Sequence, residues 1–331
     1  MKKNPSKYSL AFLPTPLHKL FHLSEQTGYD IYIKRDDQTG LATGGNKTRK
    51  LEFLIQEAVE RGCDTVITAG AQQSNHCRQT AAAAAIAGLE CHLWLNGREP
   101  EIYQGNLLLS HLMGAHLHFS GENAKGREEA LAYLQAELDK TGRKTYLIPV
   151  GGSNLTGAMG YISAMAELKK QLTNIDWQPD YIFFATSSGG TQAGIHIGKM
   201  LYNVPGNLMP VLIDKDKDFT QPLEEKIVEI IRDYNEIFNK QVRIDKNEIK
   251  IVKDYNKAEY GKLTENERTA IDVLAKNEGV LLDPVYTGRA FYGMWDILQK
   301  QKIPLGSKIL FWHTGGTPAL FAYAGELIIN I

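Results

Sequence analysis

The chain has 331 residues, of which 43% are hydrophobic and 23% are charged, a composition typical of a globular protein with a large buried core. Its formal net charge of −1 gives no attraction to nucleic acid or to an anionic membrane surface, so we expect neither partner. No run approaches the about 18 apolar residues of a membrane span, and polar residues follow Lys2 and Lys3 where a signal peptide would be apolar. We therefore expect a cytoplasmic protein. Cys63, Cys77 and Cys91 lack CxxC spacing and predict neither a disulfide nor a zinc site, and no metal is expected.

The first half of the chain alternates short apolar segments with longer amphipathic ones. Residues 1–20 are expected to be irregular, because Pro14 and Pro16 force an extended or turned backbone. A strand at 31–35 leads into a glycine-rich turn. After that turn the pattern predicts helix 47–61, strand 64–69, helix 75–87, strand 90–95, helix 104–113, strand 115–119 and helix 125–140.

The second half continues the same alternation. The charged run at 214–218, DKDKD, is expected to be a solvated loop. Around it the pattern predicts strand 146–150, a helix ending near 171, strand 181–185, a helix from about 192, helix 221–238, strand 249–252, helix 264–278, strand 280–282, helix 287–300, strand 308–312 and a closing helix. Short strands alternating with longer helices indicate an α/β fold with parallel sheets.

The stretch from Thr43 to Lys50, TGGNKTRK, is the first candidate site. Two glycines let the backbone turn sharply or approach a ligand closely, and Lys47 follows them at the start of a helix. A lysine held in a dry pocket can lose its proton and form a Schiff base. Alternatively, with Arg49 and Lys50 adjacent, Lys47 is a solvated lysine in a basic turn.

A second candidate lies in AGAQQSNHCR at residues 69–78, between a strand and a helix. Ser74, Asn75 and His76 would stand at the helix N-terminus, where free N–H groups and the helix dipole suit a carboxylate or a phosphate. The alternative is that Ser74 only caps the helix. We expect the neighbouring Cys77 to be a small buried residue and not a nucleophile.

Three more loops carry hydroxyl groups and glycines. TSSGGTQAG at 186–194 matches neither nucleotide-binding glycine motif, but its hydroxyls and backbone amides before a helix suit a phosphate group. LLDPVYTGR at 281–289 could present Tyr286 to a pocket, although a packed loop tyrosine is the simpler interpretation. WHTGGTP at 312–318 follows a further strand. Ligands bind at the carboxyl ends of parallel strands, so we expect these loops to meet.

Together these motifs resemble the fold-type II pyridoxal-phosphate enzymes, whose two-lobed parallel-sheet architecture is like that of the tryptophan synthase β subunit. More narrowly, they resemble the family of 1-aminocyclopropane-1-carboxylate deaminase and D-cysteine desulfhydrase. The resemblance runs from LPTPLHKL at 13–20 to HTGGTPALFAY at 313–323, and its most specific parts are GGNKTRKLE at 44–52 and QSNH at 73–76.

The resemblance implies a set of cofactor contacts. Lys47 would hold pyridoxal phosphate covalently, and Lys50 would approach its phosphate. Asn75 would hydrogen-bond the 3′-oxygen of the cofactor, Tyr286 would face the pyridine ring and Thr314 would meet the ring nitrogen. The phosphate loop would be formed by Ser188, Gly189, Gly190 and Thr191.

The resemblance also implies how a substrate is bound and converted. Ser74, Asn75 and His76 would receive the substrate carboxylate, and Lys47, Ser74 and Tyr286 would be the catalytic residues. The expected reaction is α,β-elimination from D-cysteine, giving pyruvate, hydrogen sulfide and ammonia. Alternatives are 1-aminocyclopropane-1-carboxylate deamination, an L-cysteate sulfo-lyase, and a non-catalytic protein that binds pyridoxal phosphate or an amino acid.

Three positions favour the desulfhydrase side of the family. The deaminase carries glutamate where this chain has Thr287, leucine where it has Thr314 and glutamine where it has His76. A neutral threonine beside the ring nitrogen would leave the ring a weaker electron sink than a carboxylate would. The family further implies a homodimer, a large cofactor-binding domain at 1–52 and 160–331, and a small domain at 53–159.

Overall fold

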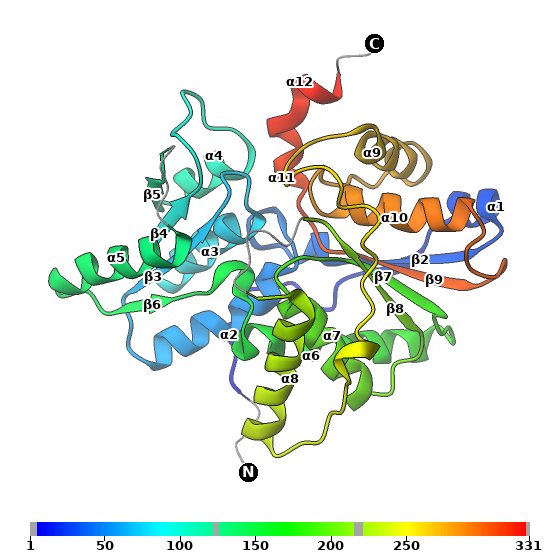
Figure 1. Ribbon diagram of the computed structural model, residues 1–331, viewed down its shortest axis with the longest axis horizontal. Coiled ribbons are helices and arrows are strands. Elements are labelled where there is room, and N and C mark those ends of the chain that lie inside the picture. The colour runs from blue at the N-terminus through cyan, green and yellow to red at the C-terminus, as the bar shows by residue number, and fades with distance from the viewer. Residues whose placement is uncertain (1–4, 122–125, 215–220, 329–331) are drawn as a thin grey trace.

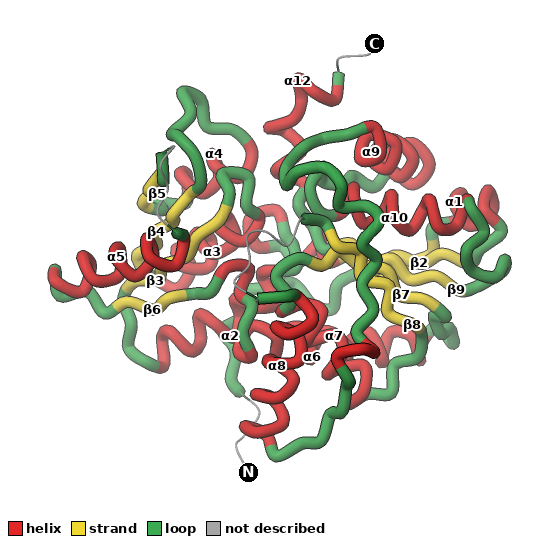
Figure 2. The backbone as a smooth tube through the Cα atoms, in the orientation of Figure 1, coloured by secondary structure: helices red, strands yellow, loops and turns green. Residues whose placement is uncertain are grey.

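The computed structural model describes residues 5–121, 126–214 and 221–328, which form two sheets, each covered by helices (Figures 1 and 2). The larger sheet has the strand order β1-β2-β9-β7-β8 and the smaller one β5-β4-β3-β6. All strand pairs are parallel except β1–β2. The larger sheet consists of β1 Leu17–Lys19, β2 Asp30–Arg35, β7 Tyr181–Thr186, β8 Asn207–Leu212 and β9 Lys308–His313, and the smaller one of β3 Thr65–Gly70, β4 Glu90–Leu95, β5 His116–Phe119 and β6 Thr145–Leu147.

Helices bury both faces of the larger sheet. Because side chains alternate along a strand, Phe183 of β7 points into one apolar cluster and its neighbours Ile182 and Phe184 point into another. The first cluster is closed by α1 Phe21–Thr27, α9 Glu265–Glu278 and α10 Thr287–Gln299, and the second by α6 Leu155–Asn174 and α7 Gly190–Leu201. Helix α8, Leu223–Phe238, packs on α6 and α7.

The smaller sheet is covered more completely on one face than on the other. Val66, Cys91 and Leu93 point toward α2 Lys47–Glu60 and α3 Asn75–Ala87. On the other face, Ile67 and Ala69 contact α5 Arg127–Lys140, which packs over β3 and β6. Helix α4, Gly105–Leu112, packs on α3, while α11 Thr317–Leu320 and α12 Ala324–Leu327 follow β9.

The predicted α/β class with parallel sheets is confirmed, and most predicted elements lie within two residues of the observed ones. The sequence analysis missed β1, α1 and β8. Pro210 interrupts the apolar run of β8, but β8 is at the end of the sheet, where a proline is tolerated. Within the described ranges, no helix has the length and apolar character needed to cross a lipid bilayer.

Two predicted strands are wrong. In 249–252, Val252 alone bridges to Val211 of β8, and the rest of the segment does not join the sheet. Segment 280–282 is extended but has no strand partner; the carbonyl of Leu281 accepts instead from His313 Nε2 over 2.9 Å. Of the charged run 214–218, residues 215–218 lie outside the described residues, and Asp214 is buried, contrary to the expected solvated loop.

Candidate active site

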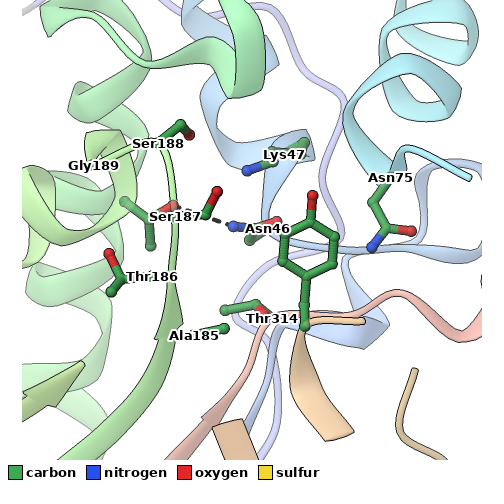
Figure 3. A pocket seen from close by; sticks show the side chains of 11 residues that line it. Asn46, Lys47, Asn75, Ala185, Thr186, Ser187, Ser188, Gly189 and Thr314 are labelled. Carbon is green, nitrogen blue, oxygen red and sulfur yellow. Dashed lines mark hydrogen bonds between the residues drawn. The ribbon is translucent and has the colours of Figure 1, made fainter. Parts of the chain in front are cut away.

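Two adjoining cavities lie where loops from both sheets meet, and they bring most of the predicted site residues together (Figure 3). The first cavity is lined by Asn46, Lys47, Asn75, Ala185, Thr186, Ser187, Ser188, Gly189, Thr191, Tyr286 and Thr314. The second shares Lys47, Ser187, Ser188 and Tyr286 with it, and adds the predicted Ser74 and His76 together with Asp214 and Tyr260. Motifs far apart in the sequence therefore form one site, as the parallel-sheet prediction requires.

Lys47 is the first residue of α2, and a tight glycine turn puts it there. Gly44 has φ 76°, and a Cβ at this position would lie 1.9 Å from the Asp37 carbonyl oxygen, so only glycine fits. The backbone N–H of Asn46 donates to the Thr314 carbonyl over 2.8 Å and joins this turn to the end of β9. Burial lowers the pKa of the Lys47 amine to about 8, so a far larger share of it is neutral near physiological pH than for an exposed lysine.

A buried charge network fixes α2 beneath the site. The Arg49 guanidinium donates to both oxygens of Asp36 over 2.9 Å and to both oxygens of Glu167, on α6, over 2.9 and 3.0 Å. Lys34 also binds Glu167. Arg49 is 2% exposed and Lys50 is 1% exposed, so the alternative of a solvated basic turn is wrong.

Lys50 lies under the loop that was predicted to bind phosphate. Its Nζ donates to the Gly151 carbonyl over 2.9 Å and would lie 3.0 Å from a Cβ on Gly190, at the start of α7. Burial, followed by the charge of Lys47, holds the pKa of Lys50 well below its usual value. Among the described residues, Lys50 lines neither cavity. Its amine therefore contacts the loop from the side that faces away from the cavities.

The loop at 187–191 leads into the N-terminus of α7, where the N-cap residue Gly189 makes no side-chain capping bond and the first backbone N–H groups can face an anion. The Ser188 and Ser153 hydroxyls are 2.7 Å apart, and Ser153 Oγ also accepts from the Gly190 N–H over 3.3 Å. Asn46 Nδ2 donates to Thr191 Oγ1 over 3.2 Å, which connects the loop to the residue before Lys47. Neither Ser153 nor Asn46 was predicted as a site residue, although Asn46 lies in the glycine-rich turn before Lys47.

Ser74 both caps α3 and lines the second cavity. Its Oγ accepts from the Cys77 N–H over 3.2 Å, so the capping alternative is correct and compatible with a place in the site.

His76 is held by Thr68. The Thr68 hydroxyl donates its one proton to the Ile148 carbonyl over 2.8 Å, so in its 2.9 Å contact with His76 it is the acceptor and His76 Nε2 is the donor. Burial, then the charges of nearby lysines, keep the pKa of His76 well below its usual value, so the ring is neutral.

The orientation of the Asn75 amide is set from behind the cavity. Asn106 Nδ2, on α4, donates to Asn75 Oδ1 over 2.9 Å, and Arg78 donates to Asn106 Oδ1 over 2.8 Å. Since the Asn75 oxygen is engaged, its NH₂ group is the one available to a ligand. Figure 3 shows Asn75 across the pocket from Ser188 and Gly189, with Lys47 between them. Arg78 lies in the motif at 69–78 but no role was predicted for it, and Asn106 lies outside every motif because it acts from a different helix.

Tyr286 lines both cavities, and its hydroxyl lies 2.7 Å from that of Tyr260, a residue that no motif indicated. Burial raises the pKa of both phenols, so both stay protonated at neutral pH.

Thr314 lines the first cavity as predicted. Thr287 is fully buried and bonds Asp283 instead, as donor to Oδ1 over 2.7 Å and as acceptor from the backbone N–H over 2.9 Å.

Cys77 is buried, as predicted, and burial raises the pKa of its thiol to about 11. At neutral pH this thiol remains protonated and is a poor nucleophile.

Comparisons with known proteins agree with this geometry. A protein of Serratia proteamaculans named D-cysteine desulfhydrase is 40% identical over 93% of this chain and 93% of its own length. A Pyrococcus abyssi protein, named as a 1-aminocyclopropane-1-carboxylate deaminase, is 38% identical over 95% of this chain and 92% of its own. A crystal structure described as an ACC deaminase homologue matches with a TM-score of 0.88 and 36% identity, covering 98% of this chain and 96% of that one.

The family model for pyridoxal-phosphate dependent enzymes matches residues 8–315, a range that contains both sheets and every residue lining the two cavities. With a desolvated lysine, a helix-capping hydroxyl–glycine loop and an oriented asparagine amide around one cavity, the chain belongs to the family of pyridoxal-phosphate dependent enzymes.

Proposed function

We propose that this enzyme is a carbon–sulfur lyase that converts D-cysteine to pyruvate, hydrogen sulfide and ammonia. The observation that carries the proposal is the neutral lining of the first cavity. Thr314 lines it, and within the described part of the chain no carboxylate does. Relatives named D-cysteine desulfhydrase, 40–41% identical to this chain, support the same assignment.

The residues present fit pyridoxal phosphate. The N-terminus of α7 and its preceding loop offer backbone N–H groups to a phosphate, and the buried Lys50 amine beneath them adds a positive charge once a phosphate is bound. The Asn75 NH₂ group would bind the 3′-oxygen, Tyr286 would face the ring, and Thr314 would meet the ring nitrogen. Lys47 would hold the cofactor covalently. When bound, the cofactor supplies an electron-withdrawing ring that stabilises negative charge on the substrate α-carbon.

The substrate would bind in the second cavity, with its carboxylate at the N-terminus of α3. Free N–H groups at that end and the helix dipole favour an anion. The His76 ring is neutral, so the backbone groups and the dipole, and not a histidine charge, would attract the carboxylate. This position leaves the substrate α-carbon near Lys47, which lines both cavities. With its pKa lowered to about 8, the Lys47 amine is suited to take the α-proton as a general base.

The paired phenols of Tyr286 and Tyr260 would act as hydrogen-bond donors. Because burial raises the pKa of both, neither gives up its proton readily at neutral pH. The leaving group is hydrosulfide, an anion that is stable in water near neutral pH, so it needs a hydrogen bond more than a full proton. The tyrosine pair therefore suits the departure of sulfide better than that of a strongly basic group.

The proposal extends to the setting of the enzyme. We propose a homodimer in the cytoplasm with a small amino acid as substrate; three unpaired cysteines support a reducing compartment. We also propose a large domain at 1–52 and 160–331 and a small domain at 53–159, since all strands of the smaller sheet fall between residues 65 and 147.

The deciding experiment measures pyruvate, sulfide and 2-oxobutanoate from four substrates: D-cysteine, L-cysteine, L-cysteate and 1-aminocyclopropane-1-carboxylate. We expect sulfide and pyruvate from D-cysteine in equal amounts, and little or no 2-oxobutanoate. The name of the Pyrococcus abyssi relative makes deamination the second candidate. Efficient cyclopropane opening without sulfide release would favour that candidate, and sulfite release from L-cysteate would favour a sulfo-lyase.

A further inference from the structure

A second group of chemically active side chains lies far along the smaller sheet from the cavities. Glu90 and His92 are on β4, and His116 and His118 are on the neighbouring strand β5; we call these four residues the histidine cluster. Parallel pairing places His92 directly opposite His116. Glu90 begins β4, whereas the cavity residues follow the carboxyl end of β3, so the cluster occupies the opposite end of the sheet from the cofactor site.

Among the described residues, α5 is the helix on this side of the sheet, and it packs mainly on the strands away from the cluster. Glu90, His92 and Trp94 alternate with Cys91 and Leu93, which point into the core under α2 and α3, so they face the side of α5. Helix α5 packs on β3 and β6 and leaves the β4–β5 side more open. The His116 side chain is 55% exposed, while that of His92 is 6% exposed. An ion could therefore reach the cluster from solvent and contact a buried ligand.

The ligand atoms are already close together. Glu90 Oε1 lies 2.9 Å from His92 Nε2 and 3.3 Å from His116 Nε2, and the three groups can offer ligand atoms within 4.8 Å of one another. Ligands of a tetrahedral Zn²⁺ ion with bonds of about 2.0–2.1 Å are roughly 3.4 Å apart. The His92 and His116 rings are stacked at 4.6 Å between centroids, so the exposed His116 ring must rotate before the lone pairs of both Nε2 atoms point at one ion.

Each of the two less exposed ligands also has a supporting partner. His92 Nδ1 lies 3.0 Å from His118 Nε2, so a metal on Nε2 leaves Nδ1–H to donate to His118. A hydrogen bond from the second ring nitrogen fixes the tautomer and the orientation of a metal-binding histidine. Arg143 pairs with the other oxygen of Glu90 and holds the carboxylate in place.

We propose that Glu90, His92 and His116 bind one Zn²⁺ ion, with water in the fourth position. Two histidines and one carboxylate form a recognised zinc ligand set with an open fourth site. No metal was expected from the cysteine spacing, and the two histidines, 24 residues apart in the chain, are brought together by strand pairing. The ion would link β4 to β5, a four-residue strand at the edge of the sheet.

The test is isothermal titration of the tag-free holoenzyme with ZnCl₂. We expect one equivalent bound, and an affinity lowered by about 100-fold or more in His116→Ala, whose exposed side chain can be removed without harming the fold. His118→Phe removes only a supporting partner, so it should weaken binding by about 10–100-fold. His22→Ala is the control, since His22 is exposed on α1 and distant from the cluster.

X-ray absorption at the zinc edge then identifies the ligands. We expect nitrogen and oxygen at about 2.0–2.1 Å and no sulfur. A sulfur shell at about 2.3 Å would place the ion on a cysteine and overturn the proposal. So would the absence of binding, or an affinity that His116→Ala leaves unchanged; the histidine cluster would then serve only to cover the sheet. Cofactor absorbance is recorded throughout, and it should not change, because the ion binds away from the cavities.

Discussion

Asn106 holds the side chain of Asn75 by a hydrogen bond of 2.9 Å from Nδ2 to Oδ1. Asn106 also donates to the Gln73 carbonyl over 2.8 Å, so both of its N–H groups fix the loop before α3. The consequence is that the amide of Asn75 enters the cavity with its donor side forward. A rotated amide would present an oxygen to the 3′-oxygen of the cofactor and repel it.

We therefore predict that Asn106→Ala weakens the binding of pyridoxal phosphate by up to about tenfold, the value of one net hydrogen bond. The measurement is a titration of apo-enzyme with the cofactor, followed by absorbance. Ser110→Ala is the matched control, because Ser110 is buried on the same helix and bonds the Asn106 carbonyl without touching Asn75. Equal affinities in the two variants would contradict a positioning role for Asn106.

Lys47 should be the residue that holds the cofactor covalently. We predict that the purified protein is yellow, and that Lys47→Ala loses both the absorption band of the covalently bound cofactor and the release of sulfide while remaining folded. Lys170→Ala, which removes an exposed lysine on α6, should keep both properties. Turnover by Lys47→Ala at the native rate would show that another lysine carries the cofactor.

The lowered pKa of Lys47 predicts how cofactor uptake depends on pH. Below its pKa the amine is protonated and cannot attack the aldehyde; above it the amine is free. With the pKa at about 8, the rate of covalent uptake by apo-enzyme should rise as the pH increases toward 8 and then level off. Stopped-flow absorbance between pH 6 and about 10 measures this, since an ordinary lysine would keep gaining free amine up to about 10.4.

The charge network around Arg49 should contribute strongly to stability. Arg49→Met leaves Asp36 without its main partner in a site where the carboxylate is fully buried, so we predict a loss of about 3–5 kcal/mol in the free energy of unfolding. Arg61→Met removes a solvent-exposed partner of Glu57 and should cost at most about 1 kcal/mol. Urea unfolding of the two variants measures the difference, and similar midpoints would mean that the buried network adds little.

Thr287 and Thr314, the two threonines that were expected to favour the desulfhydrase side, should behave differently. Thr287→Val removes a donor and an acceptor from Asp283, so we predict a loss of about 1–3 kcal/mol in unfolding free energy with little change in cofactor absorbance. Thr314→Val should change the cofactor absorbance with little loss in unfolding free energy, because Thr314 lines the cavity. Comparing thermal unfolding with cofactor spectra separates the two effects; a spectral change in Thr287→Val alone would reverse the assignment.

Local patterns were enough to predict much of this site. Glycines before Lys47, hydroxyls before α7 and the Ser-Asn-His run before α3 each identify a turn at a helix N-terminus, and the parallel fold brings such turns together. Tyr260 and Asn106 could not be predicted in the same way. Tyr260 lies in an irregular segment without periodicity, and Asn106 acts through Asn75 from a different helix. Their roles depend on tertiary packing, which no spacing along the chain encodes.

The position of β9 within the larger sheet has a consequence for biosynthesis. Strand β9 lies between β2 and β7, so residues 308–313 join the β1–β2 pair to the β7–β8 pair. All strands of the smaller sheet, by contrast, precede residue 148. A growing chain on the ribosome can therefore pair its smaller sheet long before the larger one closes. Thr314 follows directly after β9, so the complete pocket first exists when that residue has emerged, and the cofactor is captured after synthesis of the central strand and not before.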